Sequence, residues 1–381
     1  MRITFLTGSL EQGKDGVGDY TRLLAHECAS RGVASQVIAL ADRYASHPES
    51  DSSATSLETL RLGYRSPWFA RLASAGSRIR RWSPHWVSLQ FVPYSFHRWG
   101  IATRLVNGMS ELAGPAKLHA MLHEIWTGGS SWPQRVIGAS QRHCVLKLCR
   151  QAGAVVHTSN ETYQRILAEH AVNARVLPLF GSLPIADSDA DAWLPAALVE
   201  AGFGDVTANR QYWWLVAIFG TLHPVWQPEP LMQRLRAAAE ASGKRVALIS
   251  IGRLGPGEDL WRDMQRNYAA QMPMLRLGEQ PDTRISQLLN SVDFGIATSP
   301  YSLIGKSATI AAMLEHGVPV IVNREDGPAA SPHDRDQNSY IRMDHRFEDR
   351  LAQARRGPRR RRLSDVADQF LADLTWAANA C

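Results

Sequence analysis

Residues 293–323, DFGIATSPYSLIGKSATIAAMLEHGVPVIVN, decide how the chain is expected to fold. Two short apolar runs flank a segment with the apolar spacing of a helix, which opens at a Gly-Lys-Ser turn and ends at a glycine. This order predicts a strand, a helix and a second strand parallel to the first. The free N–H groups at the start of such a helix point outwards and attract anions. We therefore expect Gly305, Lys306 and Ser307 to contact a phosphate-bearing ligand.

The Gly-Lys-Ser turn also suggests a P-loop, in which glycines let the backbone wrap a triphosphate. A P-loop needs another glycine five positions before this one, but that position holds Pro300. No other glycine lies between them. We therefore set the P-loop aside, and the alternative for Lys306 is a surface lysine that contacts no ligand.

The whole chain repeats this alternation of strand-like and helix-like runs, with a break over 184–210. Strands that alternate with helices predict a parallel sheet covered on both faces. Residues 46–58 are polar and show neither the apolar period of a helix nor that of a strand, so we expect a surface loop there. The predicted strands occupy 2–7, 34–41, 85–92, 117–126, 152–159, 173–179, 212–220, 245–252, 274–278, 293–299 and 318–323. The predicted helices include 18–32, 132–151, 229–243, 258–271, 283–292, 306–317 and 363–380.

We therefore predict an α/β fold with two Rossmann-like domains facing across a cleft, since 381 residues exceed one ordinary core. Residues 1–183 form the N-terminal domain, 184–210 a linker region and 211–350 the C-terminal domain. A basic segment and a C-terminal amphipathic helix follow at 351–381. Open parallel sheets bind ligands beyond the carboxyl ends of their strands, so the site is expected between the two sheets.

The charge of the chain favours an anionic partner. The net charge is +6, and six arginines gather in residues 354–363, ARRGPRRRRL. Nucleotide sugars, an acidic membrane face and nucleic acid would all suit such an excess. A solvated linker would explain the arginine run equally well. No RNA-binding, zinc-finger or helix-turn-helix pattern accompanies it, so we expect no nucleic acid partner.

Targeting and metal signals are missing from the sequence. The first residues resemble a strand rather than a signal peptide, and no apolar run is long enough to cross a membrane. The four cysteines form no metal-like pairs, so we expect reduced thiols, no metal site and no cofactor. These features predict a cytoplasmic protein, with peripheral contact at the inner membrane face as an option for the arginine run.

In the first half, the glycine-rich loop TGSLEQGKDGVGD, residues 7–19, joins a predicted strand to a predicted helix. Gly16 and Gly18 permit a tight turn and the close approach of a ligand, and Asp19 is expected to cap the helix. The loop lacks the Gly-x-Gly-x-x-Gly spacing, so a dinucleotide site stays only an alternative. His123 lies near the end of a predicted strand and is expected to face the ligand, unless it is a buried structural histidine.

In the second half, Arg253 follows a predicted strand and has glycines on either side. An arginine in that position can hold phosphate oxygens with two hydrogen bonds, and a surface ion pair is the alternative. The next predicted strand ends at Leu277 and Gly278, whose backbone groups are expected to border a nucleotide base. No Asp-x-Asp pair stands at the end of a strand, which agrees with a site that needs no metal.

Several stretches, in order along the chain, resemble GT-B glycosyltransferases, and family four of these enzymes in particular. GVGDYTRLLAHECASRG, residues 16–32, resembles the opening of that family, and LHEIW, residues 122–126, resembles its His-Asp step. AAMLEHGVPVIV, residues 311–322, resembles the end of its donor site. The resemblance covers residues 1–182 and 212–325, and it lies in the ordered series rather than in any one motif.

This resemblance implies a GT-B fold and the metal-independent transfer of a sugar from a nucleoside-diphosphate sugar to an acceptor. The N-terminal domain would hold the acceptor and the C-terminal domain the nucleotide sugar. A carbohydrate or lipid-linked acceptor, in exopolysaccharide or glycolipid assembly, would fit. His123 would touch the sugar or the reacting centre, and the loop of Gly16, Gly18 and Asp19 would border the acceptor or the donor phosphate.

Several positions depart from the pattern of that family. Thr221 stands where the family has an arginine that holds the diphosphate, and Trp226 or Gln227 falls near the place of its lysine. Ile304 and Ala312 occupy the places of its two donor-binding glutamates. The likeness is therefore strongest in the order of elements and weakest in the side chains of the donor site.

Other residues of the second half are expected to take over these roles. Lys306, with Arg253, would replace the lost cations. Ser307 and the start of its helix would add neutral hydrogen-bond donors. The group that holds the ribose is open, and Glu315 is the nearest carboxylate in the sequence.

Two further functions stay open on the same architecture. A sugar-nucleotide epimerase would need acid–base carboxylates in the cleft, and the sequence offers no convincing set. A non-catalytic relative that binds a partner or a sugar nucleotide would explain the missing glutamates. Binding without turnover would separate that relative from an enzyme.

Overall fold

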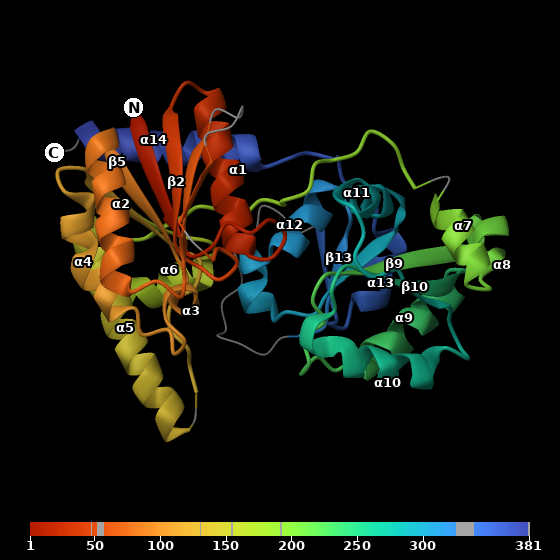
Figure 1. Cartoon of the computed structure of the whole chain (residues 1–381). Coiled ribbons are helices and arrows are strands. Elements are labelled where there is room, and N and C mark those ends of the chain that lie inside the picture. Colours follow the sequence, from red (N-terminus) through yellow and green to blue (C-terminus); the bar gives the residue numbers. More distant parts are fainter. Residues whose placement is uncertain are drawn as a thin grey trace. The chain divides into compact units, whose positions relative to one another are not determined.

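The computed structural model describes residues 1–46, 48–51, 57–129, 131–153, 155–190, 193–324 and 339–379. The chain divides into two compact units, which Figure 1 shows in colours that follow the sequence. The first unit contains Met1–Leu179 together with Leu363–Cys381, and the second contains Phe180–Arg362. The chain therefore passes between the units twice.

Within the described residues, the first unit has an eight-stranded sheet with the order β3-β4-β2-β1-β5-β6-β7-β8. Neighbouring strands are parallel, except that β3 and β4 are antiparallel. The central strands are buried along almost their whole length, as expected where helices cover both faces of a parallel sheet. The strands are β1 (Arg2–Thr7), β2 (Ala34–Asp42), β3 (Glu49–Asp51), β4 (Glu58–Gly63), β5 (Trp86–Phe91), β6 (Lys117–Leu122), β7 (Val156–Thr158) and β8 (Arg175–Val176).

The helices of the first unit alternate with these strands (Figure 1). The last helix of the chain packs beside the first, and Arg31 donates hydrogen bonds to the carbonyl and the hydroxyl of Ser364 at 3.0 and 2.7 Å. The end of the chain thus completes the first unit. The helices are α1 (Gly16–Ser30), α2 (Trp68–Trp82), α3 (Pro93–Phe96), α4 (Thr103–Ala113), α5 (Trp132–Ala152), α6 (Glu161–Ala168) and α14 (Leu363–Asn379).

The second unit has, within its described residues, a six-stranded parallel sheet with the order β11-β10-β9-β12-β13-β14. Its central strand explains the layers, because successive side chains of a strand point to opposite faces. Trp213, Leu215 and Ala217 belong to one apolar cluster, and the residues between them belong to the other. The strands are β9 (Trp213–Phe219), β10 (Arg245–Ile251), β11 (Met274–Arg276), β12 (Phe294–Ala297), β13 (Val320–Val322) and β14 (Tyr340–Arg342).

Helices cover both faces of this second sheet (Figure 1). A 3-10 helix, Tyr301–Lys306, leads from β12 into α12. The helices are α7 (Trp193–Glu200), α8 (Gly204–Ala208), α9 (Glu229–Ala241), α10 (Glu258–Tyr268), α11 (Asp282–Ser291), α12 (Ala308–Glu315) and α13 (Phe347–Gln353).

The α/β fold with two Rossmann-like units and a C-terminal helix is confirmed, and three details differ from the sequence analysis. The predicted linker at 184–210 holds α7 and α8, whose Leu194, Leu198 and Val206 are part of the core of the second unit. The loop predicted at 46–58 includes β3 in its described part. Residues 351–381 are predicted to form one separate segment. In the structure they divide between the two units, and α14 belongs to the first unit.

Candidate functional site

In each unit, the carboxyl ends of the parallel strands mark the edge where a ligand is expected. In the first unit, His123 directly follows β6 and is 5% exposed. Its Nε2 lies 3.0 Å from Oε1 of Gln90, a buried residue of β5. The ring also packs edge-on against Tyr20 of α1, with 4.9 Å between the ring centres. The structure thus joins the predicted histidine to the helix that follows the glycine-rich loop.

The imidazole of His123 is neutral at physiological pH. Burial lowers its pKa to about 3, because a charged ring would lose its hydration in this position. A neutral ring can exchange hydrogen bonds with a sugar hydroxyl, but it supplies no positive charge to a phosphate. The side chain therefore suits a polar, uncharged part of a ligand.

Backbone packing explains one glycine of the loop after β1. A Cβ on Gly18 would lie 2.3 Å from the carbonyl oxygen of Ser9, so the loop and the start of α1 can approach only without a side chain there. Nothing lies within 4 Å of a Cβ built on Gly16. Asp42, at the end of β2, accepts hydrogen bonds from the Ser9 hydroxyl and the Leu10 amide, both at 3.0 Å. The loop is therefore held from both sides.

The cap of α1 differs from the prediction. Asp15, not Asp19, is the N-cap, and its carboxylate accepts hydrogen bonds from the amides of Val17 and Gly18 at 3.0 and 3.1 Å. Asp19 lies one turn later, where burial raises the pKa of its carboxyl, and it accepts from the Gly13 amide at 3.0 Å. The prediction was wrong because the N-cap precedes the helix, and the helix begins before Asp19.

In the second unit, glycines lie at the ends of neighbouring strands. Gly220 follows β9 and Gly252 follows β10, with φ of +79° and +90°, a region that glycine adopts without strain. A Cβ on Gly220 would lie 2.9 Å from the Thr309 side chain of α12. Gly278, just beyond β11, accepts a hydrogen bond from the Gly252 amide at 2.7 Å. The ends of three strands and the start of α12 therefore meet.

Three of the predicted donor-binding residues lie at this edge: Thr221, Leu277 and Gly278. Thr221 is exposed, and its carbonyl accepts a hydrogen bond from the Thr298 hydroxyl at 3.3 Å. The Leu277 amide donates to the carbonyl of Ser250 at 2.9 Å, which continues the pairing of β10 and β11. Backbone hydrogen bonds thus hold Leu277 and Gly278 beside the end of β10, and the Gly220 amide, next to Thr221, donates to the Ile251 carbonyl at 2.9 Å.

Arg253 reaches the same edge as part of an ion pair. Its Nε lies 2.6 Å from Oε1 of Glu279, and the two side chains are 47% and 61% exposed. The pair joins the turn after β10 to the turn after β11. Exposed pairs of this kind contribute about 0–1 kcal/mol, so a stronger anion can displace the carboxylate at low cost.

The Gly-Lys-Ser turn lies before a helix as predicted, but α12 begins two residues later than expected, at Ala308. Lys306 and Gly305 are half-buried at the end of the 3-10 helix, one step before α12 begins. Ser307 is the N-cap of α12, and its hydroxyl accepts from the Ile310 amide at 3.4 Å and lies 3.0 Å from the Thr309 hydroxyl. The Ser307 hydroxyl oxygen is therefore already used in a hydrogen bond to its own helix.

Two apolar side chains fill the places where the resembling family carries glutamates. Ile304 is 3% exposed and Ala312 is 1% exposed, and both belong to the core of the second unit. These positions therefore offer no group to a donor sugar or a ribose.

Glu315 lies away from this edge, because it is the last residue of α12 and the edge is at the first. Its carboxyl is 1% exposed, and Oε1 accepts from the amides of Gly181 and Arg362 at 3.1 and 3.0 Å. Burial raises the pKa of this carboxyl. Both amides stand beside the points where the chain passes between the units, so Glu315 fits a structural role there better than the predicted ribose contact.

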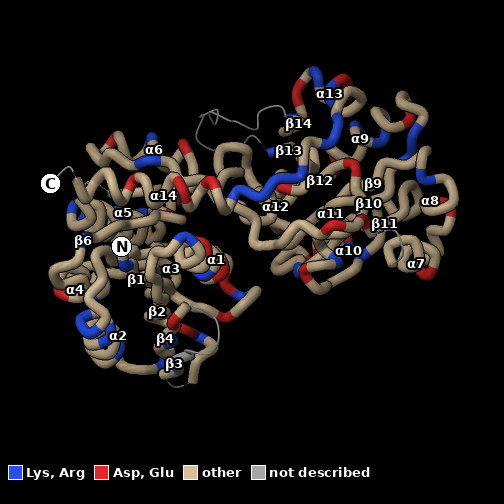
Figure 2. Tube along the Cα trace, turned by 90° about the horizontal axis from the view of Figure 1, so that it is seen from above, with Lys and Arg blue, Asp and Glu red and all other residues tan. Residues whose placement is uncertain are grey.

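A solvated linker was one explanation of the arginine run, but part of the run has a structural role. Figure 2 shows the run as a blue stretch between α13 and α14. Arg356 donates hydrogen bonds to the carbonyls of Leu289 and His316, at 2.9 and 2.6 Å, and so caps the ends of α11 and α12. Arg359 forms an ion pair with Asp189 at 2.7 Å.

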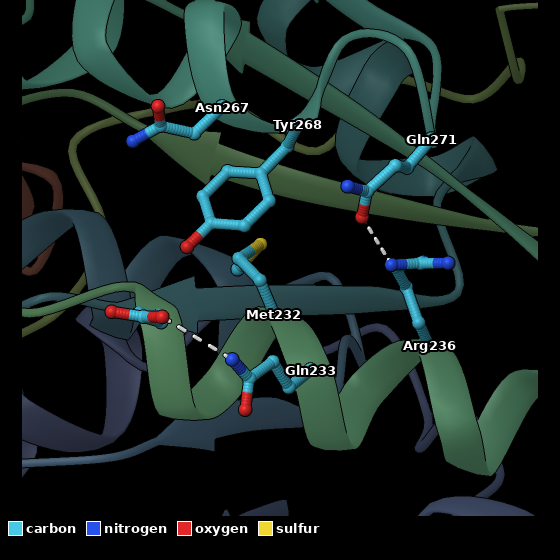
Figure 3. Close-up of a pocket in the computed structure, with 7 residues that line it drawn as sticks. Met232, Gln233, Arg236, Asn267, Tyr268 and Gln271 are labelled. Carbon is cyan, nitrogen blue, oxygen red and sulfur yellow. Dashed lines mark hydrogen bonds between the residues drawn. The ribbon is translucent and has the colours of Figure 1, made fainter.

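A surface pocket of about 500 Å³ lies between α9 and the end of α10 (Figure 3). In Figure 3, Gln233 and Arg236 of α9 donate hydrogen bonds to Glu229 and Gln271, which also line the pocket. None of the predicted site residues lines it, so it is not the predicted site. The lining residues are Glu229, Met232, Gln233, Arg236, Asn267, Tyr268 and Gln271.

The part of the chain that the structure describes has no metal-binding cluster and no membrane-spanning helix. No group of His, Cys, Asp and Glu side chains there could hold a metal ion. Cys28, Cys144 and Cys149 are buried free thiols, and Cys381 lies outside the described residues. No helix in the described ranges has the length and apolar character to cross a membrane.

Sequence reasoning gave no role to two residues, one at the strand ends of each unit. Gln90 holds the ring of His123, and its signal was a polar residue inside an otherwise buried strand, where burial demands a hydrogen-bond partner. Thr309 packs on Gly220, and no local pattern points to it because the contact joins two elements distant in sequence.

No family model matches the sequence, and no curated protein matches it. Solved structures with a similar fold include α,α-trehalose 6-phosphate synthase from Burkholderia multivorans, with a TM-score of 0.59 and 12% identity over 100% of this chain and 99% of that one. Sucrose-phosphate synthase from Thermosynechococcus elongatus has a TM-score of 0.59 and 13% identity over 99% and 91%. Anabaena HepE in complex with UDP-glucose has a TM-score of 0.54 and 14% identity over 100% and 99%.

These similar structures are GT-B glycosyltransferases, and the similarity extends over the whole chain. At such identities, the fold is what the comparisons show. The chain has the GT-B fold, as the ordered resemblance in the sequence predicts.

Proposed function

We propose that the protein is a glycosyltransferase that moves a sugar from a nucleoside-diphosphate sugar to an acceptor hydroxyl. The observation that carries this proposal is the edge of the second unit, where Gly220, Gly252 and Gly278 follow three neighbouring strands beside the start of α12. The fold supports it, because enzymes of this class share that fold over the whole chain. The complex of Anabaena HepE with UDP-glucose supports a nucleotide sugar as the donor.

The nucleotide would lie along the edge of the second unit. Backbone groups of Leu277 and Gly278 would border the base. Lys306 would face the diphosphate together with Gly305 and the N–H groups of the first turn of α12, whereas the Ser307 amide already donates to the Ile304 carbonyl at 3.1 Å. These groups combine a positive charge with backbone N–H donors, which is the chemistry that phosphate oxygens require.

Arg253 would join the diphosphate by exchanging partners. Its guanidinium now pairs with Glu279 on an exposed turn, and a phosphate oxygen offers the same planar hydrogen-bond geometry as that carboxylate. Thr221 lies next to this turn, since its side chain is 3.3 Å from a Cβ built on Gly255. Its hydroxyl would add a neutral donor where family four has an arginine.

The transfer itself breaks the bond between the anomeric carbon and the oxygen of the β-phosphate. The nucleoside diphosphate leaves with the electron pair, the acceptor oxygen forms the new bond, and the acceptor proton passes to a base or to solvent. Negative charge grows on the leaving diphosphate, and cations and amides already aimed at it lower the barrier. Lys306 and Arg253 would supply this charge without a metal, in a hexosyl transfer of the family four type.

The first unit would hold the sugar and the acceptor. His123, a neutral ring at the end of β6, suits a sugar hydroxyl. The loop of Gly16, Gly18 and Asp19 would border the acceptor or the donor phosphate. A carbohydrate or lipid-linked acceptor fits a cytoplasmic enzyme whose arginine run contacts an acidic membrane face, in exopolysaccharide or glycolipid assembly.

One observation favours a second candidate, a non-catalytic protein that binds a sugar nucleotide. Ile304 and Ala312 are buried apolar residues where family four has the glutamates that hold its donor. A protein of this kind would bind the nucleotide without turning the sugar over.

Thermal unfolding of the purified protein against a panel of nucleotides and sugar nucleotides tests the proposal. A ligand at 100 times its Kd stabilises the folded state by about 2.7 kcal/mol, so one nucleoside diphosphate and its sugars should raise the Tm together. Lys306→Ala should abolish that shift, whereas Lys244→Ala, a lysine that contacts the carbonyl of Gln211 in the same unit, should preserve it. No shift with any nucleotide contradicts the donor site.

His123→Ala separates the two candidate functions. In a transferase, this variant should lose turnover while keeping nucleotide affinity, because the nucleotide binds the other unit. Sugar release from the stabilising donor, with and without added acceptors, gives the readout. Tight binding without release by the unchanged protein would support the non-catalytic binder.

A further inference from the structure

A chain of buried hydrogen bonds begins at His123 and runs back through the sheet of the first unit. Gln90 faces His123 through its Oε1, and its Nε2 donates to the hydroxyl of Ser88 at 2.9 Å. The Ser88 hydroxyl lies 2.8 Å from Nδ1 of His119. Ser88 and Gln90 lie on one face of β5, two residues apart, and neither is more than 1% exposed.

The same chain continues to the end of the polypeptide. Nε2 of His119 lies 2.9 Å from Nδ1 of His157, and Nε2 of His157 lies 2.8 Å from Oδ2 of Asp373 on α14. Both histidines are fully buried, and the other carboxylate oxygen of Asp373 accepts a hydrogen bond from Arg175. The chain thus links a residue of the candidate site to the C-terminal helix.

The carboxylate fixes the direction of every hydrogen bond in this chain. An ionised carboxylate only accepts, so a neutral His157 donates from Nε2 and accepts at Nδ1. His119 must then donate from Nε2 and accept at Nδ1 from the Ser88 hydroxyl, which in turn accepts from Gln90. With a neutral His157, reversing the chain would aim the lone pair of its Nε2 at the carboxylate, which costs a hydrogen bond and adds electrostatic repulsion.

Protonation states in the chain agree with this direction. Burial raises the pKa of the Asp373 carboxyl, but hydrogen bonds from His157 and Arg175 outweigh it and hold that pKa below its usual value. The pKa of His119 lies well below its usual value, because the ring is buried and faces His157. Asp373 is therefore ionised and His119 neutral at physiological pH.

We propose that Asp373 is a positioning residue, which acts through four buried side chains to hold His123 in the tautomer with a proton on Nε2 and a lone pair on Nδ1. A histidine can take either tautomer in water, and the partner of one nitrogen selects the state of the other. The site would then always present an acceptor at Nδ1. The value of this for catalysis rests on the proposed transferase function, but the tautomer itself does not.

Imidazole ¹⁵N NMR of the full chain tests the proposal directly. The chain is labelled at histidine, and His123→Gln assigns the signals of His123. The unchanged protein should show one protonated nitrogen at Nε2 and one unprotonated nitrogen at Nδ1. A proton on Nδ1, or two averaged signals, would overturn the proposal whether or not the protein transfers sugar.

Asp373→Asn should remove the selection, because an amide can offer either its oxygen or its nitrogen to His157. The two signals of His123 should then move towards each other as both tautomers become populated. Asp368→Asn is the matched control on the same helix, since Asp368 is 68% exposed and pairs with Arg31 at 3.3 Å. Equal effects of the two substitutions, or no effect of either, would contradict the proposal.

Gln90→Met tests whether the effect travels along the chain. It cuts the chain beside His123, so Asp373→Asn in that background should still change the signals of His119 and His157 but no longer those of His123. A change at His123 that persists without Gln90 would show that Asp373 acts by another route. If the protein proves active, Asp373→Asn should lower kcat by roughly tenfold and leave KM for the donor unchanged.

Discussion

The first unit ends its strands in buried polar side chains, whereas the second ends them in glycines and exposed cations. His123 and Gln90 at the first edge are 5% and 1% exposed and bonded to each other. At the second edge, Gly220 and Gly252 are half-buried glycines with positive φ, and the Arg253 side chain is 47% exposed. The two units share a fold but differ in the chemistry of the edge that the fold provides.

This difference matches two kinds of ligand. Buried neutral groups keep a fixed geometry and suit uncharged hydroxyls, which need few but well-placed hydrogen bonds. Backbone amides with cations suit a phosphate, whose charge attracts them and whose oxygens accept from several directions. Substitutions at the two edges test whether they differ in this way, and their effects on stability and binding measure how much.

Gly18→Ala should have the largest effect on stability. The new Cβ would meet the carbonyl of Ser9 at 2.3 Å, and backbone on both sides cannot yield without moving the loop or α1. We expect the free energy of unfolding in urea to fall by about 3 kcal/mol. Gly16→Ala is the control, since its Cβ meets nothing within 4 Å, and it should be neutral or stabilising. Similar losses in both would show that the close packing on Ser9 does not matter.

Acid should destabilise the first unit through His123. The ring has a pKa of about 3 in the folded protein and about 6.5 in an unfolded chain, so between these values only the unfolded chain binds the proton. The free energy of unfolding therefore falls as the pH falls below about 6.5, by about 2 kcal/mol at pH 5 for this one ring. His316 and Glu315 in the second unit oppose each other, because burial lowers the pKa of the first and raises that of the second.

Urea unfolding of His123→Gln between pH 7 and pH 5 measures this contribution. The variant should lose less stability on acidification than the unchanged protein, because glutamine does not titrate. His143→Gln on α5, where the histidine is exposed, should keep the original pH dependence. An unchanged slope in His123→Gln would contradict a buried neutral ring.

Gly220→Ala should damage the second edge by a smaller amount. A side chain at φ +79° costs about 1–2 kcal/mol, and the Cβ would also press on Thr309 at 2.9 Å. Gly243→Ala provides the same kind of strain at φ +66° with nothing within 4 Å. Both variants should lose stability, but only Gly220→Ala should lose the stabilisation by nucleotide. Retained binding in Gly220→Ala would separate this edge from the donor site.

The sequence predicted most of the fold because periodicity alone carries that information. Mostly apolar strands such as β1 and β9 and helices with terminal glycines such as α1 stand out locally. β14, which contributes three residues to the sheet edge, gave no such signal, and neither did α2, where four arginines interrupt the apolar spacing. Short edge strands depend on their neighbours, so their sequences are weakly determined.

The candidate site was less predictable than the fold. Arg253, Lys306 and His123 could be predicted as candidates because the ends of strands and starts of helices are recognisable positions. Their partners were not, since the contacts of Arg253 with Glu279 and of His123 with Gln90 join different strands. Whether a cation is available to a ligand depends on such partners, and a sequence does not show them.

Glu279→Gln should give the smallest change in stability and the clearest change in binding. The pair with Arg253 is exposed on both sides, so its loss should alter the free energy of unfolding by less than about 0.5 kcal/mol. If Arg253 exchanges Glu279 for a phosphate, removing the competing carboxylate should tighten nucleoside diphosphate binding about threefold at low salt, and less at high salt. Glu258→Gln is the matched control, because Glu258 pairs with Arg276 within the same unit at 2.5 Å and should leave affinity unchanged. Titration calorimetry with the stabilising nucleotide measures both variants. Equal affinities in all three proteins would mean that Arg253 stays with its carboxylate partner, and the positive charge at the second edge would then rest on Lys306.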